Sequence, residues 1–232
     1  MKLVSNNDVV QQRADCRACT RRNSVLCASL QEQDSEQSRQ SVDLCSLLTG
    51  ALLYRAGDQG RRFFTIRSGM VKLVQYLPDG TQRIVRLLGA NDVAGLETLL
   101  GQPYQHDAVV VRATEACSLP VALVKAMSQT NAELYQELLT RWLQAVQDAD
   151  AWLTEFSTGS AQKRIARLLL RLMGGDQSVA CRLFSCEDMG AMLGVTTETV
   201  SRTIAEFKRK HVLVETKRNY VQLDTANLQR IA

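Results

Sequence analysis

Long apolar runs, a signal peptide and clustered histidines are all missing from this 232-residue chain. A membrane-spanning helix needs about 18 or more successive apolar residues, and the sequence has no such run. The first residues lack the apolar region of a signal peptide, so we expect a cytoplasmic protein without a membrane partner. The two histidines, His106 and His211, lie far apart. They are too few and too scattered for a catalytic site, so we expect no enzyme.

Cysteine, in contrast, is concentrated near the N-terminus. Of seven cysteines, Cys16, Cys19 and Cys27 have the spacing C-x2-C-x7-C. A disulfide framework is rare in a cytosolic protein. A C-x-x-C pair places two sulfurs within reach of one metal centre, and thiolates select zinc, Cu(I) or iron–sulfur clusters. Because the surrounding residues are too polar to fold alone, residues 1–30 are predicted to form a cysteine-rich metal-binding segment.

Positive charge is concentrated at the other end of the chain. The net charge is +4, and residues 158–232 contain 12 Lys or Arg against 7 Asp or Glu. The remaining residues contain 16 and 17, respectively. A basic excess confined to one domain favours contact with phosphates. This distribution therefore points to nucleic acid as a partner of the C-terminal third.

Residues 31–130 begin with a polar stretch and continue with a β-type pattern. Short β-rich runs at 63–66, 71–76 and 109–111 are separated by Gly or Asp-Gly pairs. Ser68-Gly69 is interpreted as one such turn, and Pro78-Asp79-Gly80 as a hairpin tip. Several short strands at this spacing predict an antiparallel sandwich or roll.

Residues 131–157 contain neither Gly nor Pro and predict one long helix with two apolar rows. The first row recurs at alternating three- and four-residue steps: Tyr135, Leu138, Trp142, Ala145, Ala149, Trp152 and Phe156. The second row consists of Leu139, Leu143, Val146 and Leu153, and Asp150 interrupts it. One row can pack on the β domain and the other on a second copy, which predicts a dimerisation helix. The alternative is that both rows are intramolecular core.

Residues 185–204 have the pattern of a helix-turn-helix. Ser185 and Thr196 are predicted N-caps, and Gly194 ends the first helix where a left-handed residue is needed. Gly190 is small where the two helices cross. Two β-type runs at 212–215 and 219–223 then flank the basic residues Lys217 and Arg218, which predicts a wing. Residues 158–232 are therefore expected to form a winged helix-turn-helix.

The first turns of a recognition helix face base edges in the major groove. Here they carry Thr197, Glu198, Ser201 and Arg202. Arg202 can donate two hydrogen bonds to guanine, and Glu198 can accept one from cytosine. Lys208, Lys217 and Arg218 are predicted phosphate contacts. The alternative is a helical hairpin that serves only for packing.

The whole chain resembles the Crp/Fnr family of bacterial transcription regulators. The resemblance is carried by Leu53-Tyr-Arg-Ala-Gly-Asp58, by residues 64–72 (FTIRSGMVK) and by residues 193–202 (LGVTTETVSR). It implies an α+β fold with a cyclic-nucleotide-type β-roll, a dimerisation helix and a winged helix-turn-helix. It also implies a homodimer, a pseudo-palindromic operator with TTGAT-like half-sites, and contact with RNA polymerase through Asp79 and Gly80. The dimer interface that it implies consists of Leu138, Trp142, Val146, Ala149, Asp150 and Leu153.

The N-terminal cysteines resemble those of the Fnr branch, whose members sense oxygen through a [4Fe-4S] cluster. This branch uses three N-terminal cysteines and one in the roll, and Cys117 lies in the matching context, Glu115-Ala-Cys-Ser-Leu-Pro120. The resemblance therefore implies Cys16, Cys19, Cys27 and Cys117 as ligands in an oxygen-responsive activator. From ligand type alone, zinc is an equal alternative. The alternative for Cys117 is that it packs in the core and binds no metal.

The remaining alternatives concern the roll and the other thiols. Relatives hold a nucleotide phosphate with an arginine, whereas residues 105–108 (QHDA) offer none and Asp107 would repel it. The roll is therefore expected to be a scaffold, with another small molecule as an alternative ligand. A redox switch based on Cys16 and Cys19 alone is a further alternative. Cys45 is expected in the core, and Cys181 and Cys186 are interpreted as structural.

Overall fold

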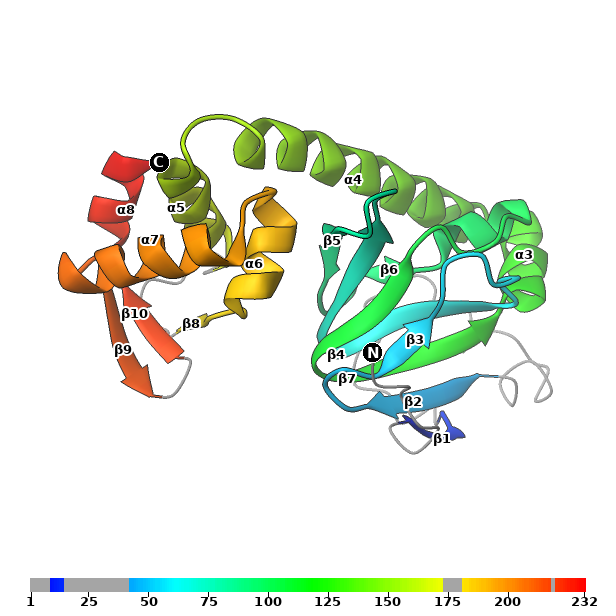
Figure 1. Ribbon diagram of the computed structural model, residues 1–232. Helices are drawn as coiled ribbons and strands as arrows, with labels where there is room; N and C mark the ends of the chain where they lie inside the picture. Colours follow the sequence, from blue (N-terminus) through cyan, green and yellow to red (C-terminus); the bar gives the residue numbers. More distant parts are fainter. Residues whose placement is uncertain (1–8, 15–41, 173–180, 218–219) are drawn as a thin grey trace. The chain divides into compact units, whose positions relative to one another are not determined.

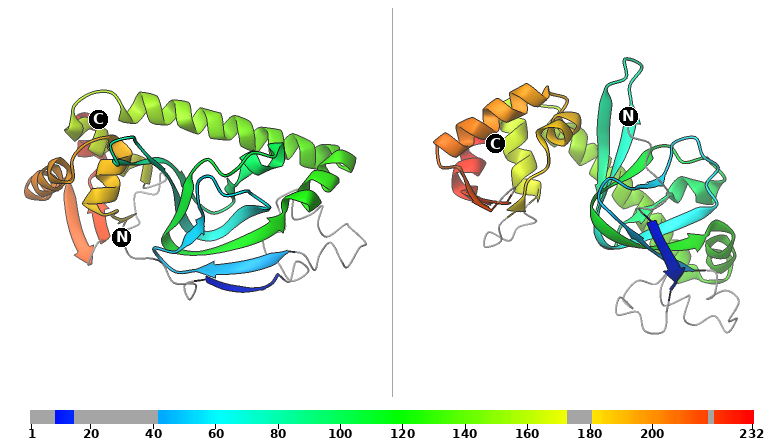
Figure 2. Two further views of the ribbon diagram at one scale, coloured as in Figure 1. Left: turned by 45° about the vertical axis from the view of Figure 1, so that its right-hand side comes forward. Right: turned by 60° about the horizontal axis from the view of Figure 1, so that its bottom comes forward.

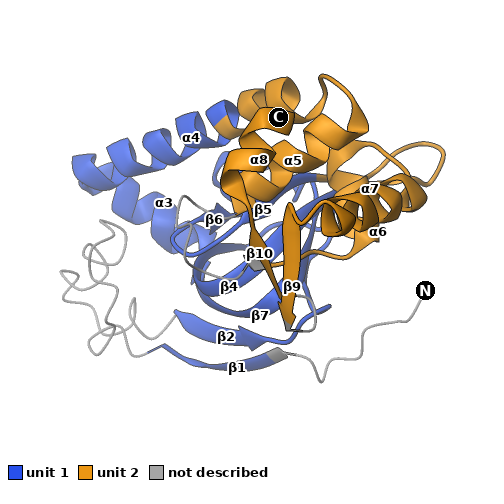
Figure 3. Cartoon of the chain, turned by 90° about the vertical axis from the view of Figure 1, so that its left-hand side faces the viewer, with its two compact units in different colours: residues 1–75, 85–147 blue, residues 76–84, 148–232 orange. Residues whose placement is uncertain are grey.

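The computed structural model describes residues 9–14, 42–172, 181–217 and 220–232 (Figure 1). Cys16, Cys19 and Cys27 lie outside these ranges. The chain divides into two compact units: unit 1 contains residues 1–75 and 85–147, and unit 2 contains residues 76–84 and 148–232 (Figure 3). No helix in the described ranges is both long and apolar enough to span a bilayer.

Unit 1 contains an antiparallel sheet that curls into a roll. Along its main path the strands are β1 (Val9–Arg13), β2 (Asp43–Leu47), β7 (Asp107–Pro120), β4 (Arg62–Tyr76) and β5 (Gln82–Leu88). Two short strands join it: β3 (Leu52–Tyr54) pairs with β7, and β6 (Val93–Ala94) pairs with β4. Figure 2 shows β1 at the outer edge of the sheet, beside β2. The roll expected from the sequence is therefore confirmed.

The turn expected at Ser68-Gly69 is wrong, because β4 runs through it without reversing. The pairing of β4 with β7 shifts register between Ile66 and Val71, which is the mark of a bulge. Gly69 has a φ of +88°, and a Cβ on it would lie 2.3 Å from the Ala113 carbonyl oxygen. Glycine is therefore needed here for a bulge and a close backbone approach, not for a turn.

Two apolar clusters lie on opposite faces of the sheet. The first fills the roll and includes Cys45, Tyr54 and Tyr104. The second, which we call the helix-side cluster, joins the sheet to α3 (Val121–Thr130) and to the first half of α4 (Ala132–Phe156). Its buried members are Val42, Phe63, Leu96, Leu119, Val121, Val124, Met127, Leu134 and Leu138. A 3-10 helix, η2 (Leu96–Leu100), supplies one of them.

Helix α4 begins where its sequence provides a cap. The Asn131 side chain accepts a hydrogen bond from the Leu134 backbone N–H at 2.9 Å, which satisfies one of the free donors of the first turn. The 25 residues that follow include no helix-breaking Gly or Pro, and the helix ends at Phe156. The long helix predicted at residues 131–157 is thus present.

Unit 2 contains the predicted winged helix-turn-helix. Its helices are α5 (Ala161–Leu172), α6 (Cys186–Leu193), α7 (Thr197–Arg209) and α8 (Thr225–Ile231). Its small sheet has the order β8 (Cys181–Arg182), β10 (Tyr220–Leu223) and β9 (Leu213–Lys217). Antiparallel β9 and β10 form the wing. The hairpin tip at residues 76–84 belongs to this unit by its contacts.

Candidate nucleic-acid interface and cysteine positions

The turn between α6 and α7 has the local structure that the sequence predicts. The Ser185 hydroxyl accepts from the Asp188 N–H at 3.0 Å, and the Thr196 hydroxyl accepts from the Thr199 N–H at 3.2 Å. Gly194 adopts a φ of +64°, in the left-handed region that glycine enters without strain. A Cβ on Gly190 would lie 2.7 Å from the Val195 carbonyl oxygen. The turn between the two helices therefore passes too close to Gly190 for any side chain at that position.

Helix α7 divides into a buried and an exposed face. Val200, Thr203, Ile204 and Phe207 are buried. All four residues predicted to contact bases are exposed: Thr197, Glu198, Ser201 and Arg202. The Arg202 guanidinium lies 3.5 Å from the Glu198 carboxylate and is 72% exposed. An ion pair this exposed contributes little stability, so the guanidinium can be redirected to a base at small cost.

One of the predicted phosphate contacts, Lys208, already has a partner within the protein. The Lys208 Nζ lies 2.6 Å from the Glu215 carboxylate of β9. A phosphate would therefore compete with Glu215 for this ammonium group. This ion pair joins α7 to the wing, seven residues further along the chain. The sequence pattern did not predict it. Lys217 is the last residue of β9, and Arg218 lies outside the described residues.

Replacing Arg202 with alanine is expected to weaken operator binding by roughly 1–3 kcal/mol and to relax the preference at one base pair, because a bidentate guanine contact is lost. Lys208→Ala, the comparison variant, should weaken all sequences alike and reduce the salt dependence. Fluorescence anisotropy on a set of operators with single base-pair changes, at several salt concentrations, measures both effects. An Arg202→Ala protein that kept every base preference would contradict a base contact.

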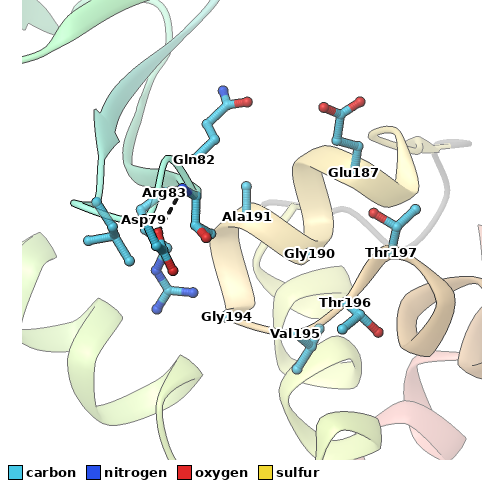
Figure 4. A pocket seen from close by; sticks show the side chains of 12 residues that line it. Asp79, Gln82, Arg83, Glu187, Gly190, Ala191, Gly194, Val195, Thr196 and Thr197 are labelled. Carbon is cyan, nitrogen blue, oxygen red and sulfur yellow. Dashed lines mark hydrogen bonds between the residues drawn. The ribbon is translucent and has the colours of Figure 1, made fainter.

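The hairpin tip and the helix-turn-helix together line a cavity of about 580 Å³ within unit 2. Figure 4 shows that Asp79 and Arg83 reach it from the hairpin, and Thr196 and Thr197 from the start of α7. Asp79 Oδ1 accepts a hydrogen bond from the Thr81 N–H at 2.8 Å, and this bond lowers the pKa of Asp79. The carboxylate is thus ionised and shapes the turn. Contact of Asp79 and Gly80 with polymerase stays a prediction.

The two apolar rows of α4 have different surroundings. Leu138 of the first row is buried in the helix-side cluster, and Trp142 packs against the same cluster. Side chains of the second row are largely exposed, at 55% for Val146 and 64% for Leu153. Asp150 lies in line with them and is exposed. Since little of Leu138 is left for a second chain, a partner would meet mainly the second row. Ala149 is half-buried.

Cys117 lies in the middle of the sheet on the face of the helix-side cluster. It pairs directly with Leu44 of β2 on one side and with Thr65 of β4 on the other. Directly opposed residues of antiparallel strands share a face. The half-buried Cys117 side chain packs against the helix-side cluster, as does Ala14. Ala14, whose N–H donates to the Val42 carbonyl at 3.0 Å, is the last described residue before Cys16.

Cys45 has the opposite orientation. It pairs with Ala116, one position from Cys117, and therefore faces the interior of the roll. Its side chain is buried, and this burial, with a smaller effect of the Asp43 carboxylate, raises the pKa of the thiol. A raised thiol pKa disfavours the thiolate that binds metal. The expected core position of Cys45 is confirmed. Among the described residues no three His, Cys, Asp or Glu side chains are grouped as metal ligands.

Aromatic side chains occupy the interior of the roll. Tyr54 and Tyr104 stack with ring centroids 3.9 Å apart, and the Tyr104 hydroxyl donates to the Arg62 carbonyl at 2.7 Å. Burial raises the pKa of Tyr54, so its ring is neutral. Asp107, which stands where a phosphate-binding arginine would be expected, accepts a hydrogen bond from the Ala56 N–H at 2.8 Å. These contacts favour the interpretation of the roll as a scaffold.

Comparison with known proteins agrees with this architecture. Residues 44–131 match the cyclic nucleotide-binding domain family, and residues 163–231 match the Crp-like helix-turn-helix domain family. The chain is 23% identical over 224 residues to the fumarate and nitrate reduction regulatory protein of Vibrio cholerae, covering 94% of this chain and 90% of that one. It is 25% identical over 226 residues to the transcriptional activator protein anr of Pseudomonas aeruginosa, covering 94% and 93%. The structure of FixK2 from Bradyrhizobium japonicum has the same fold, with a TM-score of 0.74 at 20% identity, covering 82% of this chain and 96% of that one.

Proposed function

Because this chain is a transcription regulator of the Crp/Fnr family, we propose that it responds to oxygen through a [4Fe-4S] cluster held by Cys16, Cys19, Cys27 and Cys117. The relative named for fumarate and nitrate reduction supports this proposal. The observation that carries it is the position of Cys117. Its side chain shares one apolar cluster with Ala14, near the N-terminal cysteines in sequence, and with Leu138 of α4.

The residues around Cys117 fit such a ligand. The thiol forms no disulfide, and β7 lies between β2 and β4, so the backbone of Cys117 is held on both sides. The hydroxyl of the opposing residue, Thr65, is buried and has no hydrogen-bond partner among the described residues. An unpaired buried hydroxyl costs about 1–3 kcal/mol. An inorganic sulfide of a cluster bound at Cys117 would bring an acceptor for this hydroxyl to the face that both side chains share.

A bound cluster would supply an oxygen-labile link among the four thiolates. The chain's own residues then couple Cys117 to dimerisation. Leu138 and Trp142 pack on the helix-side cluster that Cys117 also contacts, so a change in the position of β7 alters the support of α4. The exposed row of the same helix would pair with a second copy. Regulators of this family bind DNA as homodimers, and pairing lets two recognition helices meet half-sites roughly 34 Å apart.

In the proposed dimer, Asp150 lowers the stability of the helix pairing. This exposed carboxylate lies in the row of Val146 and Leu153, at a position that faces its own copy in a parallel pair of helices. Two carboxylates brought together repel each other. The free energy of pairing is thereby kept small enough for the state of the roll to control it. We also propose a TTGAT-like operator and contact of Asp79 and Gly80 with RNA polymerase.

Anaerobic purification tests the proposed cofactor. We expect brown protein with about four iron and four sulfide per chain, as the cluster formula requires, and absorbance that air bleaches. Operator affinity, measured by anisotropy in the same samples, should fall on exposure to air. Colourless protein with stoichiometric zinc would contradict the proposal, and so would operator affinity that is equal before and after exposure to air.

A further inference from the structure

A single guanidinium group, that of Arg62, joins four strands of unit 1. Its Nε donates to the Ser118 hydroxyl at 2.8 Å, and its Nη2 donates to the Ser118 carbonyl at 3.0 Å. The same Nη2 forms an ion pair with the Asp43 carboxylate. The Asp43 Oδ2 in turn accepts from the Gln11 Nε2 at 2.7 Å. Arg62 of β4 is thus connected to β7, to β2 and, through Asp43, to β1.

These contacts lie close to the end of β1. Arg13, the last residue of β1, pairs with Asp43, which pairs with Ser118. Ser118 directly follows Cys117. The guanidinium is therefore linked to β1 through Asp43 and Gln11, and it bonds directly to the backbone of Ser118, beside Cys117.

Among the described residues, β1 is held mainly by its backbone pairing with β2. The side chains of Val10, Gln11, Gln12 and Arg13 are all exposed. Apolar burial therefore adds little to the stability of its pairing. The contacts of Asp43 and Arg62, whose side chains are 24% and 31% exposed, are charge-assisted, and such hydrogen bonds are about twice as strong as neutral ones.

We infer that Arg62 is a positioning residue that sets the register of β1, and with it the position of Ala14, the last described residue before Cys16, on the cluster that Cys117 also contacts. The consequence for the cluster rests on the proposed function, whereas the attachment of β1 does not. A planar guanidinium can bridge Ser118 and Asp43 at once, and a lysine ammonium on a flexible stem cannot do so with the same geometry. The role is therefore specific to arginine.

The Arg62 side chain can be replaced without dismantling the sheet. The Arg62 carbonyl accepts from Tyr104, and the adjacent Phe63 and Phe64 are buried on opposite faces. The matched control is Arg61→Gln, which removes an exposed arginine at the neighbouring position. Gln11→Ala is a second test variant, because it deletes only the side-chain link of the exposed strand β1.

Amide hydrogen exchange of residues 9–13, measured on metal-free protein, tests the attachment of β1. In Arg62→Gln we expect exchange at least about tenfold faster than in the wild type, because charge-assisted bonds are lost. Arg62→Lys should give nearly the same increase, Gln11→Ala a smaller one, and Arg61→Gln none. Wild-type exchange rates in both Arg62→Gln and Gln11→Ala would overturn the inference.

The lifetime of the cluster absorbance in air tests the positioning role. It should shorten several-fold in Arg62→Gln and Arg62→Lys, and stay at the wild-type value in Arg61→Gln. Faster β1 exchange with an unchanged lifetime would overturn the positioning role. If the wild type holds no iron, the proposed function fails, and the exchange data still decide whether Arg62 holds β1.

Discussion

Cys117→Ala protein purified without oxygen is expected to contain almost no iron, whereas Cys45→Ala protein keeps the wild-type content. Each change removes one thiol, Cys117 from β7 and Cys45 from the neighbouring strand β2, so the two variants form a matched pair. Cys117 faces the helix-side cluster together with Ala14, while Cys45 faces the filled interior of the roll, where burial raises the pKa of its thiol. Under the proposed function, Cys117 and not Cys45 is therefore the ligand that the roll contributes. Iron analysis and absorption spectra of both variants measure the difference.

The contrary result is equally clear. Iron retained by Cys117→Ala and lost by Cys45→Ala would mean that the fourth ligand is Cys45. The Cys45 side chain would then have to leave the interior of the roll when the cluster binds. Far-UV circular dichroism controls for folding. Cys45→Ala removes a buried thiol from the interior of the roll, so its unfolding free energy should fall by about 1 kcal/mol without loss of iron.

Val146→Glu is expected to prevent dimerisation and, with it, high-affinity operator binding. Val146 is 55% exposed in the second row of α4, where a partner helix would cover it. A glutamate there would place two more carboxylates beside the Asp150 pair. We expect the dimer dissociation constant to rise at least about tenfold, which corresponds to about 1.4 kcal/mol. Analytical ultracentrifugation on anaerobic protein measures this constant, and anisotropy measures operator affinity.

Gln147→Glu is the control for this prediction. It introduces the same charge at the next residue of α4, which is also exposed but lies outside the apolar row. Its dimer constant should stay within about twofold of the wild type, as expected for a solvated charge. Equal effects of the two variants would indicate that charge anywhere on α4 matters, and the second row would no longer be the interface.

The sequence pattern predicted the helix-turn-helix in detail, whereas the turn that it predicted at Ser68-Gly69 in the roll is wrong. Ser185, Thr196 and Gly194 act on groups within a few residues of themselves, and their roles can be read from spacing. Ser68-Gly69 has the composition of a turn, yet its glycine serves a bulge imposed by Ala113 on another strand. A glycine at positive φ fits both structures, so composition could not distinguish them.

The amino-acid sequence alone determined which elements form and where the helices of the DNA-binding half begin and end, because capping and hydrophobic periodicity act over neighbouring residues. Only the tertiary structure decided which row of α4 is buried, that Cys117 and not Cys45 faces the cluster that Ala14 contacts, and that Arg62 ties β1 to the sheet. The last two of these outcomes depend on strand register. A shift of one residue turns every side chain of a strand to the other face, and register is set by partners that lie tens of residues away in the chain.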